Sequence, residues 1–380
     1  MSFDFSTDVF ANIAKPISEA RGLPNAAFTD PAFLELENRT LFRRNWVFAG
    51  RKSEIPNPGD IRMTDVAGQP LIMVRGTDDT VRVFYNVCPH RGAQIVTEDR
   101  RGARVIACKY HAWTFELSGP LRARAHFDGP NKHQKADRSD PNCPSLFPVA
   151  SDTWHDAVFV NLDGKAGSLK DHLAPVLKQA EGFDISQFEY ARTVEGVFDS
   201  NWKLTVENWS DVYHVFAVHP TLDKMIDATA RTGMSTDADL IYCHFGYDAK
   251  TLSEEPLPIA KNLQGRVRES AFMGHLFPAL CISFHPALFL LWDYKPLSHD
   301  RTQVKLHIYA AGGAAHLPEF EQILDARAKY YAELNAEDDE VCRLMQCGRR
   351  AEGYDGGRFA PYWDNGALHL AKLVADAVKK

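Results

Sequence analysis

The sequence predicts an α+β fold built from two domains, a small all-β domain followed by a larger domain of helices and antiparallel strands. Its 380 residues exceed what a single hydrophobic core usually serves. Short β-rich runs, separated by turns rich in Gly, Pro and Asp, fill the first half of the chain. Longer helical patterns and longer alternating strands follow in the second half. A pattern that changes type along the chain favours separate domains.

The first half contains the elements of the β domain. Residues 27–46 are expected to form an amphipathic helix that leads into a strand. The β-rich runs after it are IRMTDVAG, PLIMVRG, VRVFYNV, ARVIACKY and WHDAVFVNLDG. Residues 126–148 are polar and rich in proline, which predicts a surface loop.

The second half contains the elements of the larger domain. DHLAPVLKQAEGF predicts a helix, and NWKLTVENWSDVYHVFAVHP predicts a strand edge that passes into a helix. ALCISFHPALFLLWDYKPL and RTQVKLHIYAAGG alternate like antiparallel strands, and residues 318–350 carry one long helical pattern. The boundaries expected are an N-terminal helical segment over 1–40 that packs on the larger domain, a β domain over 41–160 and the larger domain over 161–380.

Composition and charge describe an ordinary globular protein. Hydrophobic residues make up 45% and charged residues 24% of the chain. A net charge of −7 argues against a nucleic-acid partner. No apolar run approaches the roughly eighteen residues of a membrane span, and the N-terminus lacks the apolar segment of a secretory signal. The seven cysteines are odd in number and scattered, which indicates reduced thiols. We therefore expect a cytoplasmic enzyme without a nucleic-acid or membrane partner.

The stretch CPHRGAQIVTEDRRGARVIACKYHAW indicates a metal site. It places Cys88-x-His90 ahead of Cys108-x-x-His111, with seventeen residues between His90 and Cys108. Two Cys and two His can form a structural zinc site, but zinc-finger sequences usually keep the two Cys together and the two His together. Here each half of the stretch supplies one Cys and one His. This arrangement suits a [2Fe–2S] cluster in which two thiolates hold one iron and two imidazoles hold the other, with zinc as the alternative.

A second candidate site lies in ENWSDVYHVFAVHP. His214 and His219 are five residues apart, so an ideal helix would turn their side chains more than a right angle away from each other. Pro220, however, disfavours the α conformation at His219. If the helix ends or bulges there, the second imidazole can turn back toward the first. Asp211 shares the helix face of His214. Two histidines on an aromatic-rich helix, without a metal, are the alternative.

The segment LNAEDDEVCRLMQCG offers a carboxylate for the same site. Its acids are Glu337, Asp338, Asp339 and Glu340. Asp338 shares a helix face with the apolar residues Leu334, Val341, Cys342 and Met345. Asp339 falls with the polar residues Asn335, Arg343 and Gln346. Because burying an unpaired carboxylate is costly, an inward-facing Asp338 needs a partner such as a metal, and it is favoured over Asp339. A solvated charged helix is the alternative.

These stretches resemble the Rieske non-haem iron oxygenases over residues 40 to 350. The family's cluster pattern, Cys-x-His and then Cys-x-x-His followed by Trp, is matched together with its flanking residues Arg91, Gly92, Tyr110, Trp113 and Phe115. Ala112 departs from it, because the family usually has Gly there. The family's iron motif matches Glu207, Asn208, Asp211, His214, His219 and Pro220. Its Glu-Asp, with Gln eight residues after the Asp and then x-Gly, matches Glu337, Asp338, Gln346 and Gly348.

The resemblance implies both metal centres and the path between them. A Rieske [2Fe–2S] cluster would be held by Cys88, His90, Cys108 and His111, with Tyr110 and Trp113 around it. Mononuclear Fe(II) would be held by His214, His219 and Asp338, with Asn208 beside it. Asp211 would link His214 to His111 of a neighbouring subunit, which makes the active unit an oligomer, expected to be a homotrimer. The larger domain would be a helix-grip (START/Bet v 1-like) catalytic domain with an antiparallel sheet.

The resemblance also implies a terminal oxygenase of a multicomponent system. It would use O2 and reductase-supplied electrons to hydroxylate or oxidatively demethylate a small organic substrate. Because no Gly-rich dinucleotide fingerprint follows a strand, an NAD(P)H-dependent reductase, alone or with a ferredoxin, is expected as a partner. An aromatic acid is the first substrate expectation, with aromatic ring hydroxylation. A betaine or another quaternary ammonium compound is the second, and mono- and dioxygenase chemistry both stay open.

Aromatic side chains in the larger domain are the candidates for substrate contacts: Trp209, Phe284, Phe289, Trp292, Tyr294 and Tyr309. They could form a cage for a quaternary ammonium group, flank an aromatic ring or serve only as core. Other classes of protein also remain open at this stage. They are a Rieske electron carrier with an inactive second domain, a zinc-clipped small-ligand binding protein and a regulatory scaffold.

Overall fold

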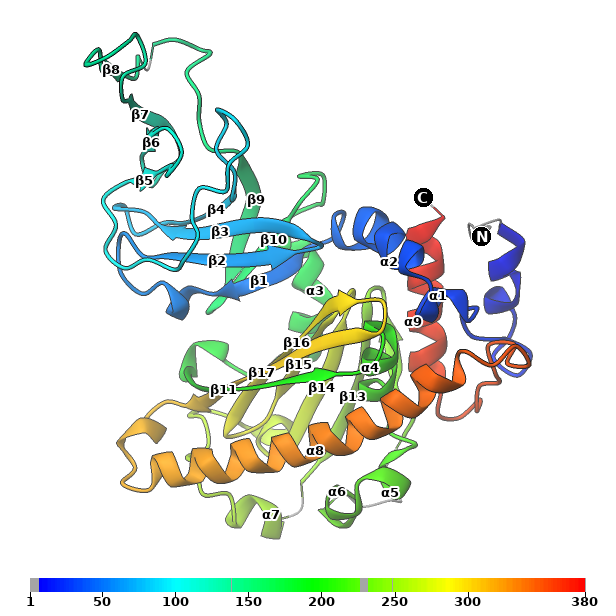
Figure 1. Cartoon of the computed structure of the whole chain (residues 1–380). Helices are drawn as coiled ribbons and strands as arrows, with labels where there is room; N and C mark the ends of the chain where they lie inside the picture. The colour runs from blue at the N-terminus through cyan, green and yellow to red at the C-terminus, as the bar shows by residue number, and fades with distance from the viewer. Residues whose placement is uncertain (1–6, 138, 226–231, 248, 380) are drawn as a thin grey trace. The chain divides into compact units, whose positions relative to one another are not determined.

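The computed structural model describes residues 7–137, 139–225, 232–247 and 249–379, and the chain divides into two compact units (Figure 1). One unit combines Met1–Leu41 with Lys170–Lys380, and the other is the continuous stretch Phe42–Leu169. No helix in the described ranges is both long enough and apolar enough to cross a membrane.

The smaller unit is built from two antiparallel sheets. The larger of them has six strands in the order β1-β10-β9-β4-β3-β2. Its strands are β1 (Val47–Arg51), β2 (Ile61–Val66), β3 (Gln69–Arg75), β4 (Val81–Tyr85), β9 (Pro148–Trp154) and β10 (Ala157–Asn161). The second sheet is formed by the chain between β4 and β9, and its four short strands are β5 (Ile106–Ala107), β6 (Thr114–Phe115), β7 (Leu121–Arg124) and β8 (Gln134–Lys135).

Strand β3 separates two hydrophobic cores in this unit. Leu71 and Met73 point into one core, whereas Ile72 and Val74 point into the other, as the two-residue period of a strand requires. Because both faces are covered, β3 carries an unbroken apolar run. The second core also contains Cys88 and Cys108, so two of the predicted cluster ligands are part of a packed interior.

The larger unit contains a seven-stranded antiparallel sheet in the order β11-β17-β16-β15-β14-β13-β12. Its strands are β11 (Phe188–Phe198), β12 (Ser235–Asp237), β13 (Leu240–Gly246), β14 (Ser270–Leu276), β15 (Leu280–Phe284), β16 (Leu288–Ser298) and β17 (Arg301–Ala311). Its α-helices are α1 (Ala26–Thr29), α2 (Pro31–Glu37), α3 (Leu169–Gln179), α4 (Trp202–Trp209), α5 (Val215–Val218), α6 (Pro220–Met225), α7 (Ala249–Ser253), α8 (Phe320–Gly348) and α9 (Asn365–Val378). Short 3-10 turns and one π-helix (Asn38–Phe42) complete the described elements.

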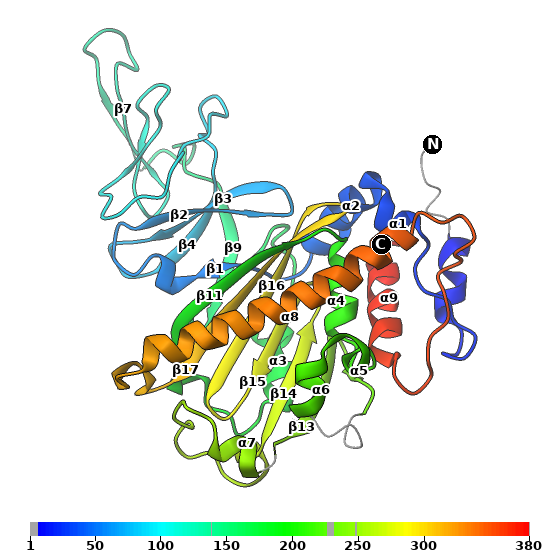
Figure 2. The same cartoon turned by 60° about the horizontal axis from the view of Figure 1, so that its bottom comes forward.

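Helix α8 crosses one face of this sheet (Figures 1 and 2). It packs against β11 and α4, and α4 in turn packs against β16 and β17. An antiparallel sheet covered by a long helix, together with the separate β unit, confirms the predicted α+β class.

Two predicted elements are wrong in detail, and capping residues explain both. Residues 27–46 form no single helix, because Asp30 leaves the helical conformation and caps α2, accepting a hydrogen bond from the Ala32 amide. The stretch that begins at Asn201 was expected to start as a strand edge, but it is α4. The Asn201 side chain caps it by accepting from the Lys203 amide, which outweighs the strand preference of its aromatic and β-branched residues.

A buried ion pair fixes α4 to the N-terminal segment. Lys203 Nζ lies 2.8 Å from Glu37 Oε1, and Trp202 Nε1 donates to Glu37 Oε2 at 3.0 Å. Glu37 and Lys203 are both fully buried. Removing one partner would leave the other charge buried and unpaired, so the pair holds α4, and the loop after it, in a defined place.

Candidate metal centres

The four Cys and His residues of the smaller unit lie on two similar turns. Cys88 and His90 follow β4, and Cys108 and His111 lie between β5 and β6. In the first turn the Gly92 amide donates to the Cys88 carbonyl, and in the second the Ala112 amide donates to the Cys108 carbonyl, both at 3.0 Å. Gly92 and Ala112 have φ values of 71° and 54°, a left-handed conformation that favours glycine. Ala112 therefore adopts a glycine-like conformation at the one position where the chain departs from the family pattern.

The donors of this site are paired by type. Cys88 and Cys108 are both buried, and the rings of His90 and His111 lie 4.7 Å apart between centroids. Burial raises the pKa of the Cys88 thiol, and the neighbouring Cys108 thiol raises it further. Amide N–H groups of His90 and Arg91 donate to the Cys88 sulfur and act against this rise. Such N–H groups would stabilise a thiolate, the form that binds metal.

The two imidazoles are held by aromatic neighbours. His90 stacks on Trp113 with 4.4 Å between ring centroids and an interplanar angle of 5°. Tyr110, which is largely exposed, lies 3.8 Å from the ring of His111. The Nδ1 atom of His111 is buried and has no hydrogen-bond partner in the described part of the chain. A buried nitrogen without a partner fits a metal ligand.

A single zinc ion fits these residues less well than a two-iron cluster does. One ion requires all its donor atoms close together. Among the described residues, His214, His219 and Asp338 form the group whose donor atoms all lie within 4.8 Å of one another, and no three of the four Cys and His donors do. The two cysteines lie together and the two histidines lie together, but the four donor atoms do not converge on one point. This arrangement fits a cluster with the thiolates on one iron and the imidazoles on the other.

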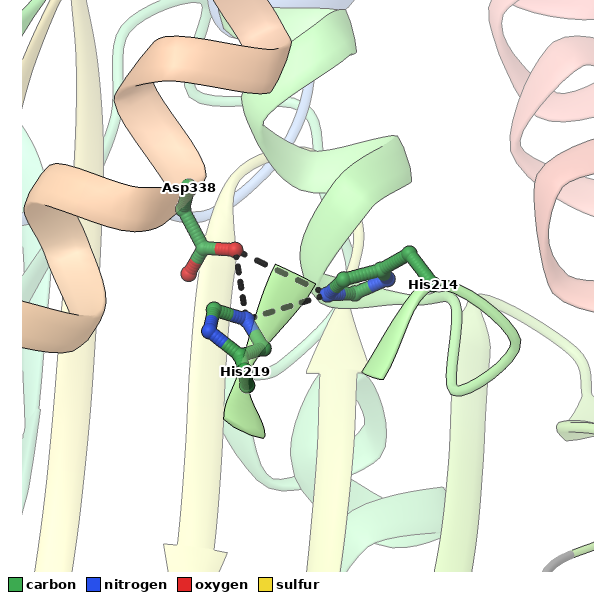
Figure 3. A group of neighbouring side chains, drawn as sticks. All are labelled: His214, His219 and Asp338. Carbon is green, nitrogen blue, oxygen red and sulfur yellow. Dashed lines mark hydrogen bonds and ion pairs between the residues drawn. The ribbon is translucent and has the colours of Figure 1, made fainter. Parts of the chain in front are cut away.

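The second site lies where the helical chain after α4 is interrupted. Helix α4 ends at Trp209, His214 is the N-cap residue of α5, and His219 is its C-cap residue. His219 has φ −116° and ψ 75°, which confirms the predicted departure from the α conformation before Pro220. Asp338 approaches from α8 (Figure 3). The interruption lets two histidines five residues apart point to the same place.

The geometry of the three side chains fits one metal ion. Nε2 of His214 lies 3.2 Å from Nε2 of His219, and Oδ1 of Asp338 lies 2.9 Å from the second nitrogen and 3.6 Å from the first. Two donors about 2.1 Å from one metal and at right angles lie about 3.0 Å apart, close to these separations. Two imidazoles and a carboxylate on one face of a metal are the ligand set of non-haem Fe(II) oxygenases.

Each ligand has a second polar partner. Asp211 Oδ2 lies 3.0 Å from Nδ1 of His214, and Glu337 Oε2 lies 2.7 Å from Nδ1 of His219. Asn208 Nδ2 donates to Asp338 Oδ1 at 2.6 Å. The structure therefore brings Asn208 and Asp211 to the site, as the resemblance implies, and it adds Glu337, to which the sequence alone assigns no role.

Without a metal, the imidazoles of the site hold protons at the positions where a metal ion would bind. Burial acts to lower the pKa of His214, but hydrogen bonds to Asp211 and Asp338 outweigh it and raise the pKa to about 9. Burial acts to raise the pKa of Asp338, but hydrogen bonds from His214 and His219 outweigh it and lower the pKa to about 2. A carboxylate stabilised as an anion beside two imidazoles fits a cation site.

The neighbouring acid Asp339 has a different role. Its Oδ1 accepts a hydrogen bond from the Asp199 amide at 2.9 Å, away from the two histidines. Gln346 shares the helix face of Asp339, seven residues further along α8, but it is not in contact with solvent there. Gln346 is buried, accepts from the Asn201 amide and donates to the Phe28 carbonyl, because the last turns of α8 are covered by the chain around α1 and α4.

The predicted aromatic residues divide between the two faces of the sheet. Trp292 lies 5.9 Å from Trp209 on α4 and 6.3 Å from Tyr331 on α8, so it points to the metal side, and Tyr294 follows it on the same face. Phe289 lies on the opposite face by the two-residue period, packed against Phe284 and Tyr309. Only part of the predicted set can therefore contact a substrate at the metal, and Tyr331 joins it.

Comparisons with known proteins agree with the division of the chain into two units. Residues 45–130 match the family model of the Rieske [2Fe-2S] domain, and residues 180–380 match that of the ring hydroxylating alpha subunit (catalytic domain). The carnitine monooxygenase oxygenase subunit of Escherichia coli (strain K12) is 32% identical over 95% of each chain. The 2-halobenzoate 1,2-dioxygenase large subunit of Burkholderia cepacia is 26% identical over 92% of this chain and 84% of its own.

Solved structures share the fold along the whole chain. The quaternary ammonium Rieske monooxygenase CntA in complex with L-carnitine has a TM-score of 0.77 at 23% identity, covering 99% of each chain. Naphthalene 1,2-dioxygenase from Rhodococcus sp. has the same TM-score at 19% identity and the same coverage. The predicted resemblance is confirmed, and the family implies a reductase partner and an oligomeric enzyme. This chain therefore belongs to the Rieske non-haem iron oxygenases, as an α subunit that is the terminal oxygenase of a Rieske system.

Proposed function

We propose that this oxygenase monooxygenates a small methylated ammonium compound that also carries a carboxylate. The reaction would take place at mononuclear Fe(II) held by His214, His219 and Asp338. The observation that carries the proposal is the aromatic group formed by Trp209, Trp292 and Tyr331 beside these ligands. The similarity to carnitine and glycine betaine monooxygenase subunits supports the same substrate class.

The aromatic group adjoins the iron ligands. Trp209 directly follows Asn208, the residue that donates to Asp338. Tyr331 lies two helical turns before Asp338 on α8, and Trp292 contacts both aromatic rings. Two indole rings and a phenol ring in edge-to-face contact suit a quaternary ammonium group bound against them, with a cation–π energy of about 2 kcal/mol for a desolvated contact. A methylammonium group bound there would have its C–H bonds next to the metal.

A hydrogen-bonded relay lies further along the same face. Ser283 and His285 share the face of Trp292, because Cys281 pairs with Trp292 and side chains alternate along β15. Ser283 Oγ donates to the Phe272 carbonyl at 3.1 Å and can therefore accept from His285 Nε2 at 2.6 Å. Nδ1 of His285 then accepts from the Tyr247 hydroxyl at 2.5 Å. Burial lowers the pKa of His285 to about 3, so the relay is neutral.

An ion pair lies next to this relay. Arg327 on α8 donates to both carboxylate oxygens of Glu255, at 2.7 and 2.6 Å. Its charge lowers the pKa of His285, after the larger effect of burial, which places the guanidinium near the relay. A hydrocarbon substrate would gain nothing from these groups. A substrate with a carboxylate at the end opposite its cation would find the Arg327 guanidinium there.

An aromatic acid is the second candidate, and Arg327 favours it as well. The guanidinium could orient the carboxylate of a benzoate while Trp209 and Trp292 flank its ring. The similarity to the 2-halobenzoate dioxygenase subunit supports this reading. The two candidates differ in whether the aromatic group contacts a cation or a neutral ring, which the experiment below separates.

The chemistry divides between the metal and the chain. Ferrous iron held by the three side chains would supply the redox chemistry that dioxygen activation needs. The net reaction consumes one O2, two electrons and two protons, and yields one hydroxylated carbon and one water. If that carbon adjoins the ammonium nitrogen, its C–N bond then breaks to give a tertiary amine, an aldehyde and a proton. Trp209, Trp292 and Tyr331 would orient the substrate and exclude water from its cation.

Electrons would enter through a Rieske cluster held by Cys88, His90, Cys108 and His111, with Tyr110 and Trp113 around it. Asp211 would carry them to His214 from the cluster of a second subunit. Beside Asp211 the larger unit exposes Tyr213, Phe216 and Tyr362, and beside the cluster residues the smaller unit exposes Tyr110 and Phe127. Exposed aromatic patches of this kind fit subunit contacts, here in a homotrimer. We expect Asp211→Asn to keep both metals and to slow reoxidation of the reduced cluster by O2 and substrate.

A single-turnover experiment tests the substrate class without the unidentified reductase. The iron-loaded protein is reduced with dithionite, freed of excess reductant and mixed with O2 and L-carnitine, glycine betaine or 2-chlorobenzoate. Amine or aldehyde from an ammonium compound supports the proposal, and turnover of 2-chlorobenzoate alone supports the second candidate. Trp292→Leu should weaken binding of the ammonium compound at least tenfold. Phe289→Leu, on the opposite face of the sheet, is the matched control and should leave it unchanged.

A further inference from the structure

Two consecutive carboxylates of α8 contact the two nitrogens of one imidazole. Asp338 Oδ1 lies 2.9 Å from Nε2 of His219, and Glu337 Oε2 lies 2.7 Å from its Nδ1. The His219 side chain is almost fully buried, whereas the Glu337 side chain is partly exposed. The short distance to a buried ring nitrogen distinguishes Glu337 from an ordinary solvated acid of a helix.

The hydrogen bond at Nδ1 decides what Nε2 can do. For Nε2 to give its lone pair to a metal, the proton of the neutral ring must be on Nδ1. A carboxylate that accepts this proton fixes the tautomer and the ring orientation, and it makes the other nitrogen a stronger donor. Glu337 is placed to do this for His219. The structure thus gives His219 its own carboxylate partner, in addition to the one that Asp211 gives His214.

The two partners come from different parts of the fold. Asp211 lies three residues before His214 in the same loop, so it can orient that histidine locally. Glu337 lies on α8 and reaches a histidine 118 residues away in sequence. Because Asp338 is the next residue of the same helix, any shift of α8 would move the third ligand and the partner of the second ligand together.

Other acids on this part of α8 have no such contact. Glu333 pairs with Lys329 one turn earlier, and Glu340 is exposed to solvent. Asp339 accepts a backbone amide from Asp199. Helix acids of this kind contribute charge to the surroundings of the metal, but they do not contact a ligand. The contrast makes Glu340, two residues after Asp338, a matched control for the loss of one negative charge.

We propose that Glu337 is a positioning residue for iron binding, which holds His219 as the Nδ1–H tautomer and strengthens Nε2 as a ligand. The inference rests on the proposed metal site and names a residue outside its ligand set. It sets the affinity of the site and the electronic surroundings of the metal without contacting it. Loss of such a partner lowers metal affinity by about 10- to 100-fold.

The test compares Glu337→Ala, Glu337→Gln and Glu340→Gln as full-length proteins with an intact Rieske absorption spectrum. Binding of Fe(II) and Co(II) to the metal-free mononuclear site is titrated anaerobically, and the EPR spectrum of the Fe(II)–nitric oxide adduct is recorded. We expect Glu337→Ala to lose about 10- to 100-fold in affinity and to change the adduct spectrum. Glu337→Gln, whose amide oxygen can still accept from Nδ1, should lose less, and Glu340→Gln should match the wild type.

Two results would overturn the inference. Wild-type affinity and an unchanged adduct spectrum in Glu337→Ala would make Glu337 an ordinary surface acid. Equal losses in Glu337→Ala and Glu340→Gln would reduce its effect to charge alone. Failure of the proposed function has a different signature, since the wild-type chain itself would then bind no metal that depends on Asp338.

Discussion

Replacing Asp338 by Asn tests the assignment of the third iron ligand. The amide has the same shape, and its oxygen can still accept the hydrogen bond from Asn208, so the fold should survive. What is lost is the charge that lies 2.9 and 3.6 Å from the two imidazole nitrogens. Removing only an outer partner of a ligand costs about 10- to 100-fold in metal affinity. Losing the ligand itself should cost at least about 100-fold, or about 2.8 kcal/mol at 1.4 kcal/mol per factor of ten.

The assay separates the two metal centres of each variant. Total iron and the EPR signal of the mononuclear site should fall in Asp338→Asn, while acid-labile sulfide and the Rieske absorption stay at wild-type levels. Asp339→Asn is the matched control, because Asp339 contacts a backbone amide and neither histidine. A full complement of mononuclear iron in Asp338→Asn, or its loss in Asp339→Asn, would refute the reasoning.

Four further predictions follow from local features of the structure. In the metal-free protein the pKa of His214 is raised to about 9, so metal uptake at pH 7 must release the proton of this imidazole. The apparent affinity for Co(II) should therefore rise about tenfold per pH unit up to about pH 9. The same shift means that the stability His214 gives the metal-free protein is complete below about pH 6.5 and is lost as the pH rises through about 9, which unfolding at several pH values would show. Ala112→Gly should stabilise the protein by roughly 0.5–1 kcal/mol in denaturant unfolding, since relief of a left-handed alanine exceeds the added entropy of glycine. Lys203→Met should destabilise it by about 3–5 kcal/mol in the same assay, because Glu37 would stay buried without its cation. A flat pH profile, a destabilised Ala112→Gly protein or an unchanged Lys203→Met protein would contradict them.

The sequence predicted best what neighbouring residues determine. Cys88, His90, Cys108 and His111 lie on two short turns, and the conformation at His219 follows from the proline after it. Local signals also explain the two elements predicted wrongly. The caps at Asp30 and Asn201 are visible in the sequence, and giving them more weight than the pattern of apolar residues would have placed both helix starts correctly.

The face on which an aromatic residue lies could be predicted only in part. The spacing of Phe289 and Trp292 by three residues already implies opposite faces of one strand. Which face carries the metal depends on α8, which is distant in sequence. The relay of Tyr247, His285 and Ser283 likewise joins two segments, because Tyr247 lies 38 residues before His285, and no local pattern indicates it.

Helix α8 shows why an apolar pattern could select Asp338 and still not indicate that Gln346 is buried. Of its 29 residues only Leu324, Cys342 and Gln346 are buried, so hydrophobic packing alone defines its position weakly. Its polar side chains supply the missing constraints. Gln346 bonds the residue that caps α4, Glu337 and Asp338 contact His219, and Arg327 pairs with Glu255. A hydrogen bond weakens when its donor–acceptor distance changes by a few tenths of an ångström, whereas an apolar contact tolerates larger shifts. These bonds therefore position the helix with the accuracy that a metal site needs. The buried Gln346 therefore helps to position the helix that carries the metal ligand. A pattern of apolar residues cannot reveal this role of a polar residue.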